Sequence, residues 1–199
     1  MSLIELVDNN RTDKNTAHSY LELYNSLLIS KKGTAKNVLE VGIDRGGSIK
    51  LWHDFFSNAT VHGLDVIDIS AVWSEIVNNP RIILHTSTDA YNEQYFNNTF
   101  LSKGFKFDFM IDDGPHTLES MKTFIRLYSQ LLTEDGILIV EDVQNWGWIN
   151  EMMKSVPDSL LPFVKTYDLR HIKGRWDDIV FTIEKKHGDR SFLSDLRSH

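Results

Sequence analysis

The stretch NVLEVGIDRGGSIKLWHDFF, residues 37–56, predicts a strand, a glycine-rich turn and a helix, in that order. Glycines at positions 42, 46 and 47 permit a tight turn and let a ligand approach the backbone where the helix begins. A dinucleotide-binding fingerprint would need a further glycine where Asp44 stands. The turn therefore indicates either a nucleotide-type loop of another kind or an ordinary connection between a strand and a helix.

The same alternation of strand and helix continues to residue 142. Short apolar segments predict strands at 37–42, 60–66, 81–86, 107–112 and 136–142, and the segments between them predict helices at 48–56, 70–77, 92–101 and 118–132. Strands joined by helical crossovers form parallel sheets that are covered on both faces. After a further helix at 148–156, two strands close together, 163–170 and 177–185, predict a C-terminal antiparallel hairpin. The fold class is therefore α/β, a doubly wound and mostly parallel seven-stranded sheet.

An amphipathic helix is predicted before this alternation begins. Residues 16–30 carry apolar side chains at helical spacing, with Thr16 available as an N-cap. The apolar positions are Tyr20, Leu23, Tyr24, Leu27 and Leu28. A length of 199 residues suits one domain, with residues 1–33 as an N-terminal helical cap and 186–199 as a polar tail.

The composition narrows the class of function. The sequence has 21 Lys and Arg residues and 28 Asp and Glu residues, which give a formal charge of −7. It has no stripe of basic residues that could follow a phosphate backbone, so we expect no nucleic-acid partner. The chain has no cysteine, which excludes disulfides, thiolate metal sites and a cysteine nucleophile. No basic segment followed by a long apolar run stands at the amino terminus, and other apolar runs have the length of strands. We therefore expect a cytoplasmic protein without a membrane partner.

Polar residues stand where the second and third predicted strands end, which is where open α/β sheets bind ligands. Asp65 follows the second strand, where a carboxylate can accept both hydroxyls of a ribose. Ser87, Thr88 and Asp89 follow the third strand and suit the edge of an adenine, although they equally suit a helix cap. Together with the glycine-rich turn, these residues predict an adenosine-containing ligand.

The fourth and fifth predicted strands both end in acidic pairs. The pairs are Asp112 with Asp113 and Glu141 with Asp142, and His116 follows the first. Carboxylates that meet in a partly desolvated place need raised pKa values or a cation among them. Oxygen ligands favour a hard divalent ion such as Mg²⁺, Ca²⁺ or Mn²⁺. The alternative is a turn in which Pro115 opens the next helix while the second pair faces solvent.

With these motifs in place, the chain resembles class I S-adenosylmethionine-dependent methyltransferases over nearly its whole length. More narrowly, it is similar to the small metal-dependent sugar O-methyltransferases related to the mycinamicin and macrocin enzymes. The segments that carry the resemblance are TDKNTAHSYLELY, LEVGIDRGGSIKLW, HGLDV, IDDGPH and VEDV. The most specific features are GGS followed by Trp52, the D-G-x-H spacing from Asp113 to His116, and the pair Glu141 and Asp142.

The resemblance implies a Rossmann-like methyltransferase fold that binds S-adenosylmethionine and a divalent cation, with Mg²⁺ as the first choice. It assigns the methionine part of the cofactor to Glu40, Gly42, Gly46, Gly47 and Ser48, the ribose to Asp65, and the adenine to Ser87 and its neighbours. It assigns the cation to Asp113, Glu141 and Asp142, and the general base to His116, with Asp113 beside it. Asp112 is expected near the cofactor, and Lys14, His18 and Tyr20 in an amino-terminal segment that closes over it.

The implied acceptor is a small molecule or glycan with a vicinal diol, such as a deoxyhexose. A cation held by the carboxylates would chelate two adjacent hydroxyls, and His116 would take the proton from one of them. Side chains after the fifth strand are candidates for the sugar contact, namely Trp146, Trp148, Arg175 and Trp176. Pro115 departs from the family pattern, which has a small polar residue there, and the first turn is shorter. A homo-oligomer and a module of a larger glycosylation protein are both compatible with the sequence.

Three other functions stay open at this point. A metal-dependent methyltransferase of catechols would use the same chelation on a flat ring. A nicotinamide-dependent oxidoreductase would share the fold, although Asp44 in the glycine-rich turn counts against it. A non-catalytic binding module would have lost the chemistry, although the complete set of acids and His116 counts against that reading.

Overall fold

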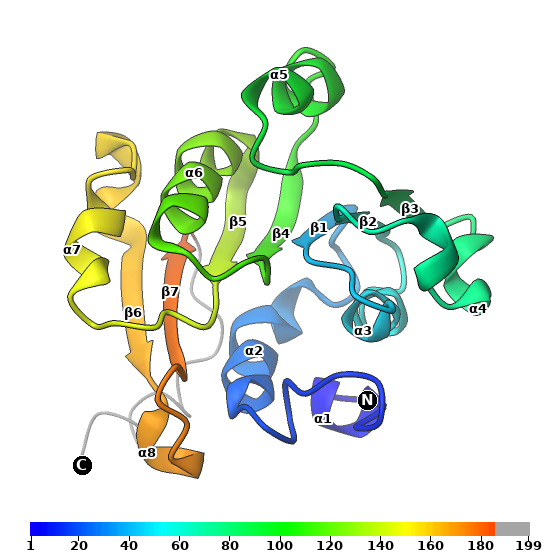
Figure 1. Ribbon diagram of the computed structural model, residues 1–199, viewed down its shortest axis with the longest axis horizontal. Helices are drawn as coiled ribbons and strands as arrows, with labels where there is room; N and C mark the ends of the chain where they lie inside the picture. The colour runs from blue at the N-terminus through cyan, green and yellow to red at the C-terminus, as the bar shows by residue number, and fades with distance from the viewer. Residues whose placement is uncertain (186–199) are drawn as a thin grey trace.

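The computed structural model describes residues 1–185, which are arranged around one seven-stranded sheet (Figure 1). The strands are β1 (Asn37–Val41), β2 (Thr60–Leu64), β3 (Ile82–His85), β4 (Phe107–Asp112), β5 (Leu132–Val140), β6 (Val164–Asp168) and β7 (Ile179–Glu184). Their order across the sheet is β3-β2-β1-β4-β5-β7-β6. The pairs among β1 to β5 are parallel, whereas β7 runs antiparallel to both β5 and β6. The predicted doubly wound sheet with a C-terminal antiparallel hairpin is confirmed.

The direction of winding reverses between β1 and β4, in the middle of the sheet. From β1 the chain moves outward to β2 and β3, and then crosses back to place β4 on the other side of β1. Val41 pairs with Asp112 at the carboxyl ends of these two strands. The loops that follow β1 and β4 therefore leave the sheet in opposite directions, which opens a crevice at this position.

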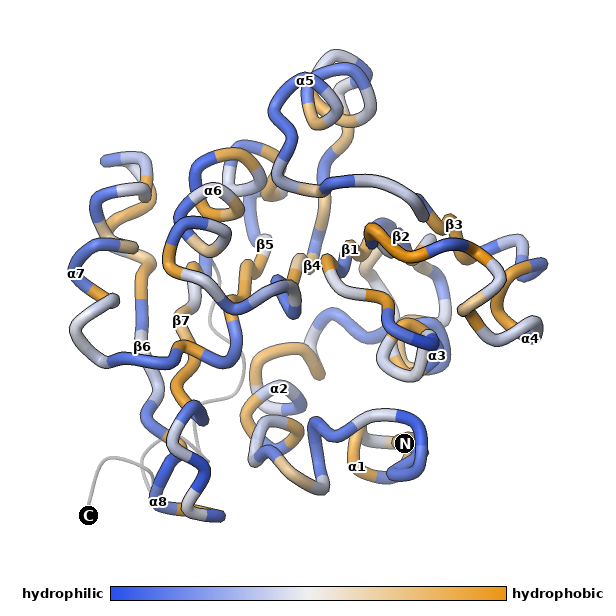
Figure 2. Tube along the Cα trace, in the orientation of Figure 1, coloured by the Kyte–Doolittle hydropathy of each residue, from blue (hydrophilic) through white to orange (hydrophobic). Residues whose placement is uncertain are grey.

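Two hydrophobic cores lie on the two faces of the sheet, because successive strand residues point to opposite sides. Phe109 and Ile111 of β4 join the core that contains α2 (Tyr20–Leu28), α3 (Gly47–Phe55) and α4 (Ser74–Val77). Met110, between them, joins the core formed with α5 (Glu93–Phe96), α6 (Leu118–Tyr128) and α7 (Trp148–Met153). Figure 2 shows hydrophobic residues along β1, β2 and β7 and hydrophilic residues in many of the connections.

The N-terminal region differs from its prediction. A short helix, α1 (Leu3–Leu6), comes first, and α2 begins at Tyr20 with Ser19 at its N-cap position, so the Thr16 cap is wrong. The reason is that residues 8–18, called the N-terminal strap below, are held by side-chain contacts far along the chain. Lys14 reaches Asp113 at the end of β4, and His18 reaches Asp178 before β7. The buried stripe of α2 agrees with the predicted apolar spacing.

Two predicted helices are broken, and one strand is longer than expected. The segment 70–77 divides into a 3-10 turn, Ile69–Ala71, and α4, because the amide of Trp73 donates to the carbonyl of Arg45. The segment 92–101 continues from α5 into a π-helical turn, Asn97–Leu101. Strand β5 begins at Leu132 instead of 136, with a shift of register opposite Phe107–Phe109. The last helix, α8 (Arg170–Lys173), lies between β6 and β7.

No helix among residues 1–185 combines the length and the apolar character needed to cross a membrane. The predicted polar tail, 186–199, lies outside the described residues.

His62 on β2 gives the stability a pH dependence. Its Nδ1 lies 3.3 Å from His85 Nε2, and its ring meets Phe100, Phe105 and Phe107 edge to face. Burial, followed by the charge of His85, lowers the pKa of His62 from 6.5 to about 4. The unfolded chain therefore binds a proton below pH 6.5 that the folded protein accepts only near pH 4. We therefore expect protonation of His62 to leave the free energy of unfolding unchanged above pH 6.5 and to lower it by about 3 kcal/mol as the pH drops to 4.

Urea unfolding of the wild type and of His62→Phe between pH 4 and 7 measures this contribution. The carboxylates titrate in both proteins, so the difference between the two curves isolates His62. The variant should lose less stability than the wild type over this range. Parallel curves would show that the folded protein accepts the His62 proton as readily as the unfolded chain.

Candidate active site

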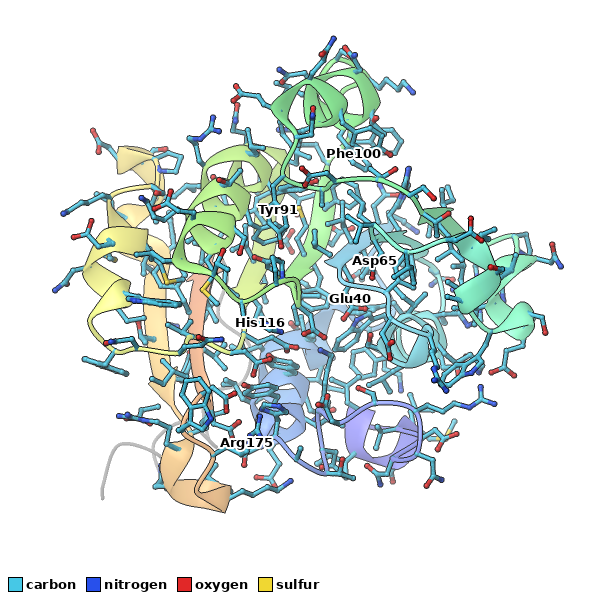
Figure 3. All side chains as sticks on the ribbon, viewed as in Figure 1. Glu40, Asp65, Tyr91, Phe100, His116 and Arg175 are labelled. Carbon is cyan, nitrogen blue, oxygen red and sulfur yellow. The ribbon has the colours of Figure 1, made fainter. Side chains whose placement is uncertain are left out.

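A cavity of about 870 Å³ opens where β1, β2 and β4 end. That volume suits a ligand of nucleoside size. The loops after β1, β2 and β4 supply Gly42, Asp65 and Asp113 to its wall, and the start of α3 supplies Gly47 and Ser48. The N-terminal strap supplies Asn9 to Asp13 and Thr16. In Figure 3, Glu40, Asp65 and His116 gather in the middle of the view, and Arg175 lies below them near α8.

The glycine-rich turn after β1 is closely packed against backbone from two other segments. A Cβ on Gly42, which has φ +93°, would stand 1.9 Å from the carbonyl oxygen of Asp113. A Cβ on Gly47 would stand 1.8 Å from the carbonyl oxygen of Arg11 in the strap. Gly46 occupies the N-cap position of α3 in the left-handed region. The turn therefore needs glycine for its conformation and for the approach of the strap.

Glu40 is fully buried beneath this turn. Its Oε2 accepts from Ser48 Oγ at 2.7 Å and from Trp52 Nε1 at 3.1 Å. Its Oε1 is buried and has no hydrogen-bond partner among the described residues. Burial raises the pKa of Glu40 to about 7. The nearest charged group to Oε1 is the ammonium of Lys14 at 3.6 Å, so Glu40 supports the turn and the start of α3 from below the cavity.

The carboxylate of Asp65, after β2, accepts hydrogen bonds from backbone amides of the neighbouring loops. Its Oδ2 accepts from the amide nitrogens of Ile43 at 2.6 Å and Asp44 at 3.1 Å. Its Oδ1 accepts from the amide of Ile67 at 3.2 Å. These bonds fix the carboxylate at the wall of the cavity, where its remaining acceptor positions are available to a ligand.

Asp112 and Asp113 take different directions at the end of β4. Asp112 is buried and accepts from Tyr91 Oη at 2.5 Å. Burial raises the pKa of Asp112 to about 7. The side chain of Asp113 is 27% exposed and turns toward the strap and His116. The two aspartates therefore have different surroundings, and the roles expected for them stay predictions.

Asp113, His116 and Asp142 meet beside the cavity. His116 Nε2 lies 3.7 Å from Asp113 Oδ1 and 3.5 Å from Asp142 Oδ2. One ligand atom of each residue lies within 4.8 Å of the other two, a spacing that could hold a metal ion. Burial raises the pKa of Asp142. The side chain of His116 is 29% exposed, so an acceptor can reach it from solvent.

Glu141 stands apart from this group. Its Oε1 binds the ammonium of Lys14, which also donates to Asp113 Oδ2 at 2.6 Å. Its Oε2 accepts from Tyr24 Oη at 2.6 Å. The three predicted cation ligands therefore do not face one common point, because the ammonium of Lys14 lies between Asp113 and Glu141.

A second cluster of acids lies behind Asp142. Tyr20 donates to Asp142, and His18 Nδ1 lies 2.7 Å from Asp178 Oδ1 and 3.3 Å from Asp142 Oδ1. On the other side of the ring, Arg175 Nη2 lies 3.3 Å from His18 Nε2. His18, Asp177 and Asp178 have the spacing of a metal site. However, both ring nitrogens are engaged and a guanidinium is already present, so we interpret the cluster as support for Asp142.

The strap is tied down on both sides of the cavity. Arg11 pairs with Glu75 of α4 and stacks over the ring of Trp73 at 4.2 Å. Lys173 of α8 donates to the carbonyl oxygens of residues 15, 16 and 18. These contacts hold the strap in the wall of the cavity.

The backbone is strained at the same edge of the sheet. Among residues 1–185, the non-glycine residues with positive φ are Asp44, Ser87, His116 and Asp142, with values from 45° to 55°. They lie in the loops after β1, β3, β4 and β5. Such strain collects at functional sites, because the surrounding structure must hold it.

Several predicted cofactor residues do not line the cavity. Gly42, Gly47, Ser48 and Asp65 line it, but Glu40, Gly46, Ser87, Asp112, Lys14 and Tyr20 are not among the lining residues. Lys14 and Tyr20 bind the acids after β4 and β5 instead. Of the three residues predicted near the adenine, Thr88 and Asp89 line the cavity and Ser87 does not. Trp148 packs in the core with α6, whereas Trp146 and Trp176 are exposed.

Two parts of the site are absent from the sequence-based assignment. Tyr91, which donates to Asp112, directly precedes the predicted helix 92–101, and nothing in the sequence marks it as part of a site. The resemblance predicts an amino-terminal segment over the cofactor and names Lys14, His18 and Tyr20 in it, but the residues of this segment that line the cavity are 9–13 and 16.

Several curated proteins similar to this chain are named as sugar O-methyltransferases. No protein-family model matches the sequence. The mycinamicin VI 2''-O-methyltransferase of Micromonospora griseorubida is 26% identical over 118 residues, which are 56% of this chain and 28% of that protein. The 8-demethyl-8-alpha-L-rhamnosyl tetracenomycin-C 2'-O-methyltransferase of Streptomyces olivaceus is 26% identical over 144 residues, 69% of this chain and 36% of that protein.

The chain is similar to sugar O-methyltransferases in sequence and in fold. A solved structure of MycE methyltransferase from the mycinamycin biosynthetic pathway, in complex with Mg and SAH, has a TM-score of 0.71 and 21% identity. The match covers 96% of this chain and 56% of the MycE chain. The Rossmann-like methyltransferase fold implied by the sequence is therefore confirmed, and the resemblance to sugar O-methyltransferases is borne out. The chain spans about a third of the length of the curated sugar O-methyltransferases it matches.

Proposed function

We propose that the chain is an S-adenosylmethionine-dependent O-methyltransferase that requires a divalent cation, with Mg²⁺ as the first choice, and acts on a sugar hydroxyl. The observation that carries the proposal is the meeting of Asp113, His116 and Asp142 beside a cavity of nucleoside size, with Asp113 in the cavity wall. The names of the relatives support the reaction class, and the Mg and SAH of the MycE structure support the two bound groups.

The cavity wall fits S-adenosylmethionine. Gly42 and Gly47 keep the turn free of side chains, and Asp65 offers carboxylate oxygens to the ribose. Glu40 lies beneath the wall and accepts from Ser48, which itself lines the cavity, so it holds this part of the wall in place. When bound, the cofactor supplies an electrophilic methyl group on a sulfonium centre, and the cation supplies positive charge that favours loss of a proton from the acceptor hydroxyl.

Asp113 and Asp142 fit a hard cation, because both present a carboxylate oxygen toward the same space. His116 lies beside both oxygens and is partly exposed, so we assign it as the general base that takes the hydroxyl proton. The exposed rings of Trp146 and Trp176 are proposed to meet the apolar face of the acceptor. Chelation suits an acceptor with two adjacent hydroxyls, such as a deoxyhexose.

Mass spectrometry of methyl transfer tests the proposal. The purified protein is incubated with S-adenosylmethionine and a panel of deoxyhexose glycosides and catechols, with Mg²⁺ or with EDTA. We expect one added methyl group on a deoxyhexose with Mg²⁺ and none with EDTA. If the protein methylated catechols and no deoxyhexose, the acceptor would be a catechol instead of a sugar. Thermal stabilisation by NAD⁺ but not by S-adenosylmethionine would favour an oxidoreductase instead.

His116→Gln is expected to lower kcat by about 10²- to 10⁴-fold, because the variant loses the group that accepts the proton. Cation affinity should change little, since the carboxylates of Asp113 and Asp142 remain. Initial rates of S-adenosylhomocysteine formation measure the loss, and Mn²⁺ titration measures the binding. His171→Gln is the matched control, because His171 is an exposed histidine on α8. An unchanged kcat in His116→Gln would remove His116 from the mechanism.

A further inference from the structure

We infer that Lys14 is a permanent internal cation of this site, which occupies Glu141 and leaves the divalent cation to bind through Asp113 and Asp142. The inference rests on the proposed function for its divalent cation. It departs from the ligand set that the sequence predicts, because it removes Glu141 from direct contact with the ion. It also gives Lys14 a positioning role at the cation site in place of a contact with the cofactor.

The contacts of Lys14 are the first support. The side chain is 1% exposed, and its Nζ binds Glu141 Oε1 and donates to Asp113 Oδ2 at 2.6 Å. Glu40 Oε1 lies 3.6 Å from the same nitrogen. Carboxylates at the ends of β1, β4 and β5 therefore surround one ammonium, which balances part of their charge in a place that water does not reach.

The use of each carboxylate oxygen is the second support. Both oxygens of Glu141 are engaged, one by Lys14 and the other by Tyr24 Oη. Asp113 gives Oδ2 to Lys14 and turns Oδ1 toward His116. Asp142 gives Oδ1 to Tyr20 and turns Oδ2 toward His116. The two carboxylate oxygens that lie near His116 Nε2 therefore belong to Asp113 and Asp142, and Glu141 has no oxygen left to bind an ion there.

The position of Lys14 in the chain is the third support. It lies in the N-terminal strap, of which Arg11 packs against Gly47 and Thr16 lines the cavity. The strap therefore delivers a positive charge to the acids as it covers the cofactor cavity. In this arrangement Lys14 orients Asp113, one of the two carboxylates left for the divalent cation, by holding its Oδ2.

Mn²⁺ binding to the whole protein, followed by electron paramagnetic resonance, tests the ligand set without reference to activity. Asp142→Asn should weaken Mn²⁺ binding by at least about 100-fold, because it removes a direct ligand. Glu141→Gln should stay within about threefold of the wild type, because Gln keeps the shape of a group that does not touch the ion. A loss in Glu141→Gln as large as that in Asp142→Asn would overturn the inference.

A double-mutant cycle in cation-free protein tests the pairing of Lys14 with Glu141 independently. Lys14→Met should lower Tm by about 10 °C, because it leaves buried carboxylates without their cation. Lys14→Met combined with Glu141→Gln should recover several degrees, since one of the unpaired charges is gone. Strictly additive shifts in Tm would overturn the inference.

The two experiments separate failure of the inference from failure of the proposed function. A wild-type protein that binds no Mn²⁺ would contradict the cation-dependent function, and with it the division of ligands. The pairing of Lys14 with Glu141 would still be decided by the double-mutant cycle. A wild-type protein that binds Mn²⁺ and loses it on Glu141→Gln would leave the proposed function intact and overturn only the inference.

Discussion

Asp142→Asn is expected to lower the rate of methyl transfer at least about 100-fold while affinity for S-adenosylmethionine stays nearly unchanged. The carboxylate faces His116 with Oδ2 and is held by Tyr20 through Oδ1, so the substitution removes charge where the cation is proposed to bind. Asp142 does not line the cofactor cavity. Initial rates by mass spectrometry and calorimetric titration with the cofactor measure the two effects separately.

Asp158→Asn is the matched control for this substitution, because Asp158 is an exposed aspartate at the start of a 3-10 turn remote from the sheet ends. It should transfer methyl groups at the wild-type rate. Wild-type protein treated with EDTA should resemble Asp142→Asn, and added Mg²⁺ should restore only the wild type. Full activity of Asp142→Asn without a cation would falsify the proposed role of the acids.

Gly42→Ala is expected to destabilise the protein by roughly 3–5 kcal/mol and to reduce cofactor affinity at least about tenfold. Its φ of +93° disfavours a side chain, and the new Cβ would stand 1.9 Å from the carbonyl oxygen of Asp113. Either β1 or β4 must shift to relieve that contact. The shift would move the turn that forms one wall of the cavity. Urea unfolding and cofactor titration measure the two losses.

Gly33→Ala is the control for Gly42→Ala, because a Cβ on Gly33 meets no atom within 4 Å. Its stability should differ from the wild type by less than about 1 kcal/mol. If both alanine variants had the same stability, the close packing of Gly42 against β4 would have no energetic importance.

The sheet could be predicted because its strands are short, apolar and separated by crossover helices. The acids after β4 and β5 could be placed together for the same reason, since parallel strands end at one edge. The short helix α4 could not be predicted, because the bond between Trp73 and Arg45 that divides its segment joins residues far apart in sequence. The spacing of apolar residues in the segment 70–77 gives no indication of that bond.

The detailed geometry of the site could not be predicted for a related reason. Lys14 stands 99 residues from Asp113 and 127 from Glu141, and its segment has no regular period. A sequence pattern identifies the acids as possible ligands, but not the ammonium that lies between two of them. The direction of each carboxylate depends on Tyr20, Tyr24 and Tyr91, whose hydroxyls become neighbours of the acids only in the folded chain.

The place of β7 in the sheet has a consequence for the order in which the protein assembles during synthesis. β7 lies between β5 and β6, although it follows both in the chain. On the ribosome, β6 therefore has no partner until β7 has emerged. Asp178, just before β7, also holds His18 across 160 residues of sequence. The strap is translated before the sheet, but its bond to Asp178 cannot form until the segment that precedes β7 has emerged, so this edge of the sheet is completed only after β5 and β6 have been made.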